Sequence, residues 1–193
     1  MLSLAAISYH STIRDVQAQP LAASGPFASR EWFEQLEATQ PRPVYAVAED
    51  ASGAVVLPLR RKGRRFESLL DGRGFTWRPL ATPYGSLDSL LIALAQALAA
   101  RTSHIVLDRV PDEDGIARQL QRAFERAGWL VVRERCEAGR RPARKRDDGC
   151  PQSRLDETRP PYRLQCRRKR DPRNWPAIAR TRLRTLVSGD APS

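Results

Sequence analysis

Four side chains that often contact ligands stand at the ends of predicted strands: Trp77, Arg78, Asp108 and Arg109. Sheets with packed helices place many of their ligand contacts at strand ends, and arginine in particular suits anions. These four residues are therefore our candidate substrate-binding residues. The same residues also suit a structural role, with Trp77 buried in a core and Asp108 in an ion pair with an arginine. The structural interpretation is favoured.

The sequence gives little support for a catalytic triad or a metal site. The two histidines, His10 and His104, are far apart in the sequence, and no Ser–His–Asp arrangement can be argued around either of them. The three cysteines, Cys136, Cys150 and Cys166, contain no CxxC pair, and a zinc site needs four closely spaced donors. We therefore predict no catalytic, metal-binding or cofactor-binding residue, and we expect unpaired thiols.

Positive charge is concentrated in the last part of the chain. Of the net charge of +11, residues 1–135 contribute +2 and residues 136–193 contribute +9. A second basic run, RRKGRR at 60–65, could contact phosphate or an acidic partner, but a solvated hairpin loop is the favoured interpretation. The body of the chain is thus close to neutral, and its basicity does not by itself indicate a nucleic-acid-binding domain.

The chain up to residue 135 carries the hydrophobic periods of strands and helices. Alternating apolar residues predict strands, and a spacing of three to four residues predicts helices. The predicted elements are a strand at 2–9, a helix at 27–39, a hairpin at 44–48 and 54–59, strands at 66–70 and 75–80, a helix at 86–100, a strand at 104–110, a helix at 113–127 and a strand at 129–135. This order predicts a mixed α/β sheet with helices packed on it.

Local signals predict where these elements begin and end. Ser29, Ser86 and Asp112 are suitable N-cap residues for the three helices, and Gly128 suits the residue that follows the last one. Pro58 cannot donate a backbone hydrogen bond, so we expect an edge or a bulge at its place in the hairpin.

Residues 136–193 differ from residues 1–135 in amino-acid composition. They contain seven prolines and few large apolar side chains, so we expect most of this segment to be a disordered basic tail. One short amphipathic helix is expected after Pro176. Such a tail would bind nucleic acid through its phosphates without sequence specificity. The chain is expected to be cytoplasmic, without a signal peptide or a membrane span.

Four stretches of residues 30–135 and their flanks carry a resemblance to a known family: PFASREWFEQL, VYAVAEDASGAVVLPLRRKGRRFESL, FTWRPL and IVLDRVPDEDGIARQLQRAFERAGWLVVRERC. With these stretches, residues 30–135 resemble the N-terminal half of a bacterial group of GNAT-superfamily acetyltransferases, which are built from two GNAT-like repeats and often labelled cellulose-biosynthesis proteins. The resemblance covers about the first two-thirds of the chain.

The resemblance implies acyl transfer from acetyl-CoA to an amine or hydroxyl, with an unknown acceptor in envelope or exopolysaccharide metabolism. In that family the acyl-CoA loop lies in the second repeat, and its glycine pattern is not found in this chain. We therefore expect 1–135 to be a non-catalytic GNAT-like domain and 136–193 a truncated or frame-shifted end, with no acetyl-CoA bound. The alternative is a small α/β interaction domain with a basic, nucleic-acid-binding tail.

Overall fold

The computed structural model describes residues 5–17, 29–70, 76–82, 87–112, 114–136 and 161–168. Three α-helices, one short 3-10 helix (η1) and eight strands form within these ranges. In chain order they are β1 (Ala6–His10), η1 (Ile13–Asp15), α1 (Arg30–Thr39), β2 (Pro43–Asp50), β3 (Gly53–Lys62), β4 (Arg65–Ser68), β5 (Leu80–Ala81), α2 (Leu87–Ala99), β6 (His104–Val110), α3 (Ile116–Arg126), β7 (Trp129–Arg135) and β8 (Tyr162–Arg168).

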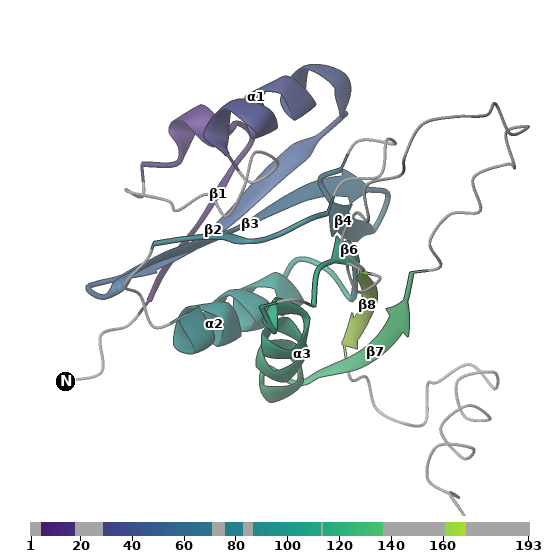
Figure 1. The fold of residues 1–193 in the computed structure, drawn as a ribbon. Helices are drawn as coiled ribbons and strands as arrows, with labels where there is room; N and C mark the ends of the chain where they lie inside the picture. Colours follow the sequence, from purple (N-terminus) through teal and green to yellow (C-terminus); the bar gives the residue numbers. More distant parts are fainter. Residues whose placement is uncertain are drawn as a thin grey trace, which may run out of the picture.

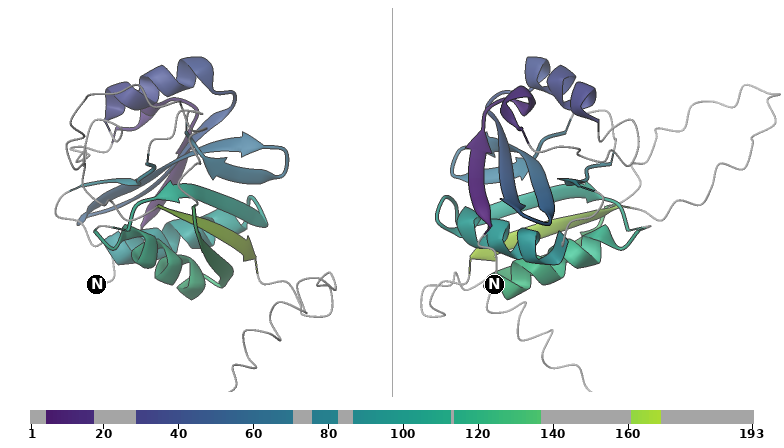
Figure 2. Two further views of the ribbon diagram at one scale, coloured as in Figure 1. Left: turned by 45° about the vertical axis from the view of Figure 1, so that its right-hand side comes forward. Right: turned by 90° about the vertical axis from the view of Figure 1, so that its left-hand side faces the viewer.

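The strands form one mixed sheet, as the sequence predicts. Their order is β1-β2-β3-β4-β6-β8-β7, and the short β5 pairs with β3 beside this path. All neighbours are antiparallel except β4 and β6, which run parallel. The helix α1 lies on one face of the sheet and α2 and α3 lie on the other (Figures 1 and 2). The α/β class with helices packed on a mixed sheet is confirmed.

Each face of the sheet has its own apolar core. The larger core lies under α2 and α3 and includes Leu94 and Phe124. The smaller core lies under α1 and includes Phe33, Leu36 and Tyr45. Strand residues alternate between the two faces, so Ala46 and Leu57 enter the first core while Tyr45 and Val56 enter the second.

The predicted N-terminal helix forms with the predicted cap. The backbone N–H of Trp32 donates to the hydroxyl of Ser29, 3.2 Å away, which satisfies one of the free donors in the first turn. Phe33 and Leu36 are three positions apart and share the buried face. Both strands of the predicted hairpin also form, and β3 runs on through Arg60 and Lys62 into the basic sequence.

Pro58 is not at a sheet edge or a bulge, so this expectation was wrong. It lies inside β3, paired with Tyr45 of β2, at the point where the other neighbour of β3 changes from β4 to β5. The absent N–H therefore interrupts no ladder. The carbonyl oxygen of Pro58 instead accepts from the backbone N–H of Leu69 and from the indole of Trp77.

The helices α2 and α3 bury the predicted apolar positions, including Leu90, Leu94, Leu120 and Phe124. The predicted cap of α3 was wrong, because the helix begins at Ile116 and Asp112 makes no side-chain cap. Gly115 precedes the helix in the left-handed region at φ 75°, which only glycine adopts without strain. Gly128 follows the helix at φ 87°, as predicted.

Two strand predictions need correction. Residues 75–80 were predicted as a strand, but only Leu80 and Ala81 join the sheet as β5. Residues 76–79 have no regular secondary structure. Residues 162–168 were assigned to the tail, but they form β8 between β6 and β7. The described domain therefore extends past the expected boundary at residue 135.

The side chains of β8 explain its place in the sheet. Tyr162, Leu164 and Cys166 alternate along the strand and are all buried, with 8%, 0% and 0% of their surface exposed. The backbone of β8 pairs with β6 from Tyr162 to Arg167 and with β7 along its whole length. This period of two is the pattern of a strand with one face in a core.

Several predictions fall outside the described residues. These are the Ser86 cap, Cys150, the helix after Pro176, and the remainder of the basic tail. Within the described ranges, none of the helices combines the length and apolar character that crossing a bilayer requires.

Candidate functional site

The two parallel strands β4 and β6 are the feature around which charged side chains gather. They pair at only two positions, Phe66 with Ile105 and Glu67 with Val106, and β6 then continues to Val110 without pairing with β4, while its other edge pairs with β8. A parallel pair this short leaves backbone groups to be satisfied by other means at both of its ends.

Trp77 fills the carboxyl end of the pair. Its side chain is 1% exposed and its indole N–H donates to the carbonyl oxygen of Pro58 at 2.7 Å. Its backbone N–H donates to the carbonyl oxygen of Arg109 at 2.9 Å. The irregular segment 76–79 thus takes the place of a strand beside the last residues of β6. The favoured interpretation of Trp77 as a buried packing residue is confirmed.

A hydroxyl joins the ends of β4 and β6 beside Trp77. Ser68 is buried, its Oγ accepts from the backbone N–H of Asp108 at 2.8 Å, and it lies 3.4 Å from the carbonyl oxygen of Asp108. On the other side of β6, its register against β8 shifts between Leu107 and Val110, and Arg109 between them has a φ of 58°. The serine side chain therefore replaces the ladder hydrogen bonds that a regular strand would have made here.

Asp108 forms an ion pair with Arg163 of β8. Arg163 Nη2 lies 2.8 Å from one carboxylate oxygen and Nε lies 3.3 Å from the other. Partial burial opposes ionisation of Asp108, but the hydrogen bonds and charge of Arg163 outweigh it and lower the pKa of the carboxyl group. The predicted Asp–Arg pair therefore exists, with a partner that lies beyond residue 135.

Cys136 completes this cluster, with its Sγ 3.5 Å from Asp108. Burial and the neighbouring carboxylate raise the pKa of the thiol, so the neutral form dominates near pH 7. Arg78 lies apart from the cluster and pairs with Asp114 at the start of α3. Of the four candidate residues, the structure thus brings together Trp77, Asp108 and Arg109, and every one of these contacts is internal.

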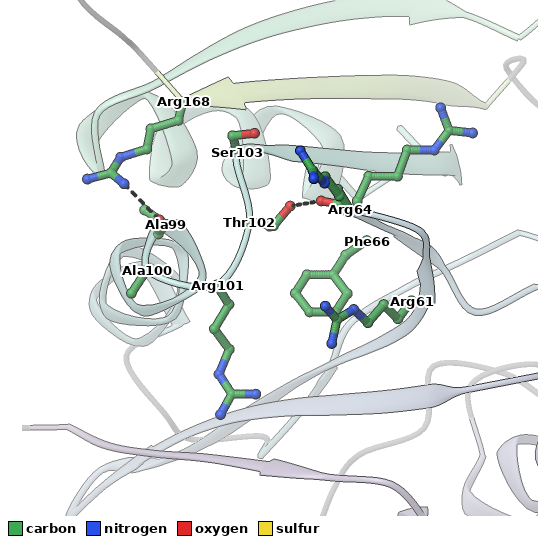
Figure 3. A pocket seen from close by; sticks show the side chains of 10 residues that line it. Arg61, Arg64, Phe66, Ala99, Ala100, Arg101, Thr102, Ser103 and Arg168 are labelled. Carbon is green, nitrogen blue, oxygen red and sulfur yellow. Dashed lines mark hydrogen bonds between the residues drawn. The ribbon is translucent and has the colours of Figure 1, made fainter.

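The amino end of the pair carries a cavity of about 300 Å³, which we call the arginine cavity. Figure 3 shows its lining from the β3–β4 hairpin, the end of α2 and the end of β8. The residues that line it are Arg61, Arg64, Arg65, Phe66, Ala99, Ala100, Arg101, Thr102, Ser103 and Arg168. Five of these ten are arginines and none is acidic.

Carboxylates compensate little of this charge. Glu67 is not one of the lining residues, and it pairs with Arg60, Lys62 and Arg65, one carboxylate against three bases. Burial opposes ionisation of Glu67, but these neighbours outweigh it and lower the pKa. Among the described residues, neither Arg61 nor Arg64 forms an ion pair with a carboxylate.

Neutral groups hold two of the remaining arginines. Arg101 lies over the ring of Tyr9, with 3.7 Å between the guanidinium carbon and the ring centroid. Arg168 donates to the carbonyl oxygen of Ala99 at 3.1 Å, at the carboxyl end of α2. These contacts fix the positions of both side chains, but neither guanidinium group has a carboxylate partner among the described residues.

The sequence indicated only part of this cavity. The run at 60–65 was predicted as a hairpin loop, and its turn does fall at Gly63 and Arg64, between β3 and β4. Arg101 and Arg168 were not predicted, because they reach the cavity through the packing of α2 and β8. No local pattern marks either of them.

No family model matches the chain, and neither the curated proteins nor the solved structures searched contain a match. The described residues contain no group of three or more His, Cys, Asp or Glu placed to hold a metal ion.

His104 lies at the amino end of β6. Burial, Arg167 and Arg65 lower the pKa of His104, whose ring has a buried nitrogen without a hydrogen-bond partner. The carboxyl end is suited to structural stability and the amino end to binding an anion.

Proposed function

We propose that the chain is an acetyltransferase-related protein whose described domain does not itself transfer an acyl group. The sequence resemblance to the first repeat of two-repeat GNAT proteins supports the relationship. The arrangement around Trp77 supports the absence of transfer. The acceptor in the related enzymes, an amine or a hydroxyl, is part of the same proposal.

The observation that carries the proposal is the occupied space at the carboxyl ends of β4 and β6. An acyl-CoA bound between diverging strands needs room for its chain and free backbone N–H donors. Here the indole of Trp77 fills the space. The N–H groups of Leu69, Trp77, Asp108 and Arg109 all have internal acceptors. This lack of space and of free donors supports the proposal that acetyl-CoA does not bind at these residues.

Among the described residues at this end, no side chain is suited to act as a catalytic base. A base that accepts the proton of an amine needs a pKa near the working pH. The Asp108 carboxyl has a lowered pKa and is held by Arg163, and the Cys136 thiol is held neutral. Neither group is placed or poised for proton transfer.

The test is a calorimetric titration of acetyl-CoA into the full chain, followed by a thiol assay for free CoA with a set of amines. Because CoA carries phosphates that the arginine cavity could attract, the titration is repeated on Arg61→Gln/Arg64→Gln. We expect no binding that persists in this variant and no CoA release. Micromolar binding that persists in the variant, with CoA release on adding an amine, would overturn the proposal.

The alternative function, an interaction domain with a nucleic-acid-binding tail, gains nothing from the described part of that tail. Arg163 pairs with Asp108 and Arg168 with the end of α2, so both arginines hold the domain together. The alternative therefore rests on residues outside the described ranges.

A further inference from the structure

We propose that the arginine cavity binds a small ligand that carries two or more linked phosphate groups. This inference is independent of the acetyltransferase relationship. It concerns the amino end of the β4–β6 pair, where arginines from distant parts of the chain line one cavity.

The convergence is a property of the fold. Arg61, Arg64 and Arg65 come from the β3–β4 hairpin, Arg101 follows α2, and Arg168 ends β8. Like charges repel each other, and more strongly at a protein surface than in water. Because the described residues that line this cavity include five arginines and no acidic residue, an anion is the ligand that the cavity favours.

Internal contacts do not account for this arrangement. A structural explanation would require carboxylates between the arginines, as Asp108 provides for Arg163 at the other end of the strands. Glu67 serves this purpose only for Arg65 among the lining residues. Arg61 Nε makes one long contact of 3.4 Å with the carbonyl oxygen of Gly63, and the Arg64 side chain has no such contact among the described residues. These two guanidinium groups remain available to a ligand.

The chemistry of the lining points to phosphate. A guanidinium group presents paired N–H donors whose spacing matches two oxygens of a phosphate, and several such groups favour a ligand with several phosphates. Ser103 adds a hydroxyl at the rim. Thr102 hydrogen-bonds to the carbonyl oxygen of Arg64 at 2.8 Å, which ties the hairpin to the chain after α2 and fixes two walls of the cavity relative to each other.

The shape favours a small ligand over nucleic acid. A volume of about 300 Å³ lies at the small end of ligand sites in proteins. Single-stranded nucleic acid is bound along a basic track with exposed aromatic rings on which bases stack. The arginines here surround one hollow, and its only aromatic residue, Phe66, is 5% exposed.

The experiment uses inorganic pyrophosphate and tripolyphosphate as probes, with monophosphate for comparison. Each is titrated calorimetrically into the full chain and into two double variants of equal charge. Arg61→Gln/Arg64→Gln removes two exposed arginines of the cavity. Arg118→Gln/Arg122→Gln removes two exposed arginines of α3, which lie outside the cavity. Circular dichroism spectra establish that all three proteins are folded.

We expect the polyphosphates to bind more tightly than monophosphate. The cavity variant should lose at least about tenfold in affinity, and the α3 variant should stay within about twofold of the parent chain. Arg101→Gln, which changes a different wall, should weaken binding in the same direction. The bound probe should also raise the melting temperature of the parent chain more than that of the cavity variant.

Three results would overturn the proposal. Equal losses in the two double variants would show that only net charge matters. Absence of polyphosphate binding at low salt would show that the cavity takes no phosphate ligand. A single-stranded RNA oligonucleotide that binds more tightly than tripolyphosphate and loses affinity in the cavity variant would assign the arginines to nucleic acid.

Discussion

Charged side chains gather at both ends of the parallel β4–β6 pair, but their partners differ. At the carboxyl end, Asp108 has Arg163, Ser68 and Cys136 within contact distance, and Trp77 closes the space beside them. At the amino end, five arginines line a cavity that has no acidic residue in its lining.

This difference separates a structural site from a binding site. A polar group whose partners all lie in the same chain gains nothing from a ligand, because the ligand would have to displace those partners. A charged group without such partners gains hydrogen bonds and loses repulsion when a ligand binds. Aspartate and tryptophan at strand ends looked like ligand contacts in the sequence, yet the arginines of the opposite end are the better candidates.

The strand β8 connects the two ends, since it carries Arg163 at one and Arg168 at the other. Leu164 is fully buried in the middle of β8, so Leu164→Asp places a charge in the core. We expect a loss of at least about 4 kcal/mol in the free energy of unfolding, measured by urea denaturation. It should also abolish polyphosphate binding.

The matched control for this change is Val132→Asp on the neighbouring strand β7. Val132 is 44% exposed, so the same substitution should cost no more than about 0.5 kcal/mol. If Leu164→Asp unfolds at the same urea concentration as the parent chain, β8 does not lie between β6 and β7.

Trp77→Ala tests the carboxyl end alone. The change removes a buried ring and an indole hydrogen bond, and we expect a loss of about 3–5 kcal/mol in the free energy of unfolding. Trp77→Phe keeps most of the ring and loses only the bond to Pro58, so its cost should be about 1–2 kcal/mol. Urea denaturation of the two variants distinguishes packing from hydrogen bonding, and equal losses would contradict the role assigned to the ring.

Long periodic segments made most of the fold predictable. The helices over Leu87–Ala99 and Ile116–Arg126 and the strand His104–Val110 repeat their apolar residues often enough to be recognised. The strand β8 has the same kind of signal, since Tyr162, Leu164 and Cys166 alternate, but it spans only seven residues. The surrounding arginines and prolines led to its assignment to a tail.

The sites were harder to predict because they depend on tertiary partners. The sequence correctly favoured a buried Trp77 and an Asp–Arg pair, but the choice of Arg163 depends on how β8 pairs with β6. The arginine cavity depends on three segments that meet only in the folded chain. The sequence contains 30 arginines, and nothing in it distinguishes the five that line the arginine cavity from the others.

The ion pair between Asp108 and Arg163 should have a smaller and pH-dependent effect. Asp108→Asn is expected to lower the free energy of unfolding by about 1 kcal/mol at pH 7, because Arg163 is half exposed and water screens the pair. The double variant with Arg163→Gln should cost less than the sum of the two single changes, as measured in a double-mutant cycle.

The pH dependence follows from the lowered pKa of Asp108. A carboxyl group whose pKa is lower in the folded chain than its usual value of about 3.9 stabilises the fold above that value, and this contribution is lost as the pH falls through the folded pKa. The difference between the parent chain and Asp108→Asn should therefore be constant from about pH 5 to pH 7 and shrink below about pH 4. A difference that persists undiminished to about pH 2 would mean that the substitution acts through packing, and the carboxyl end would then owe its stability to Trp77 and Ser68 alone.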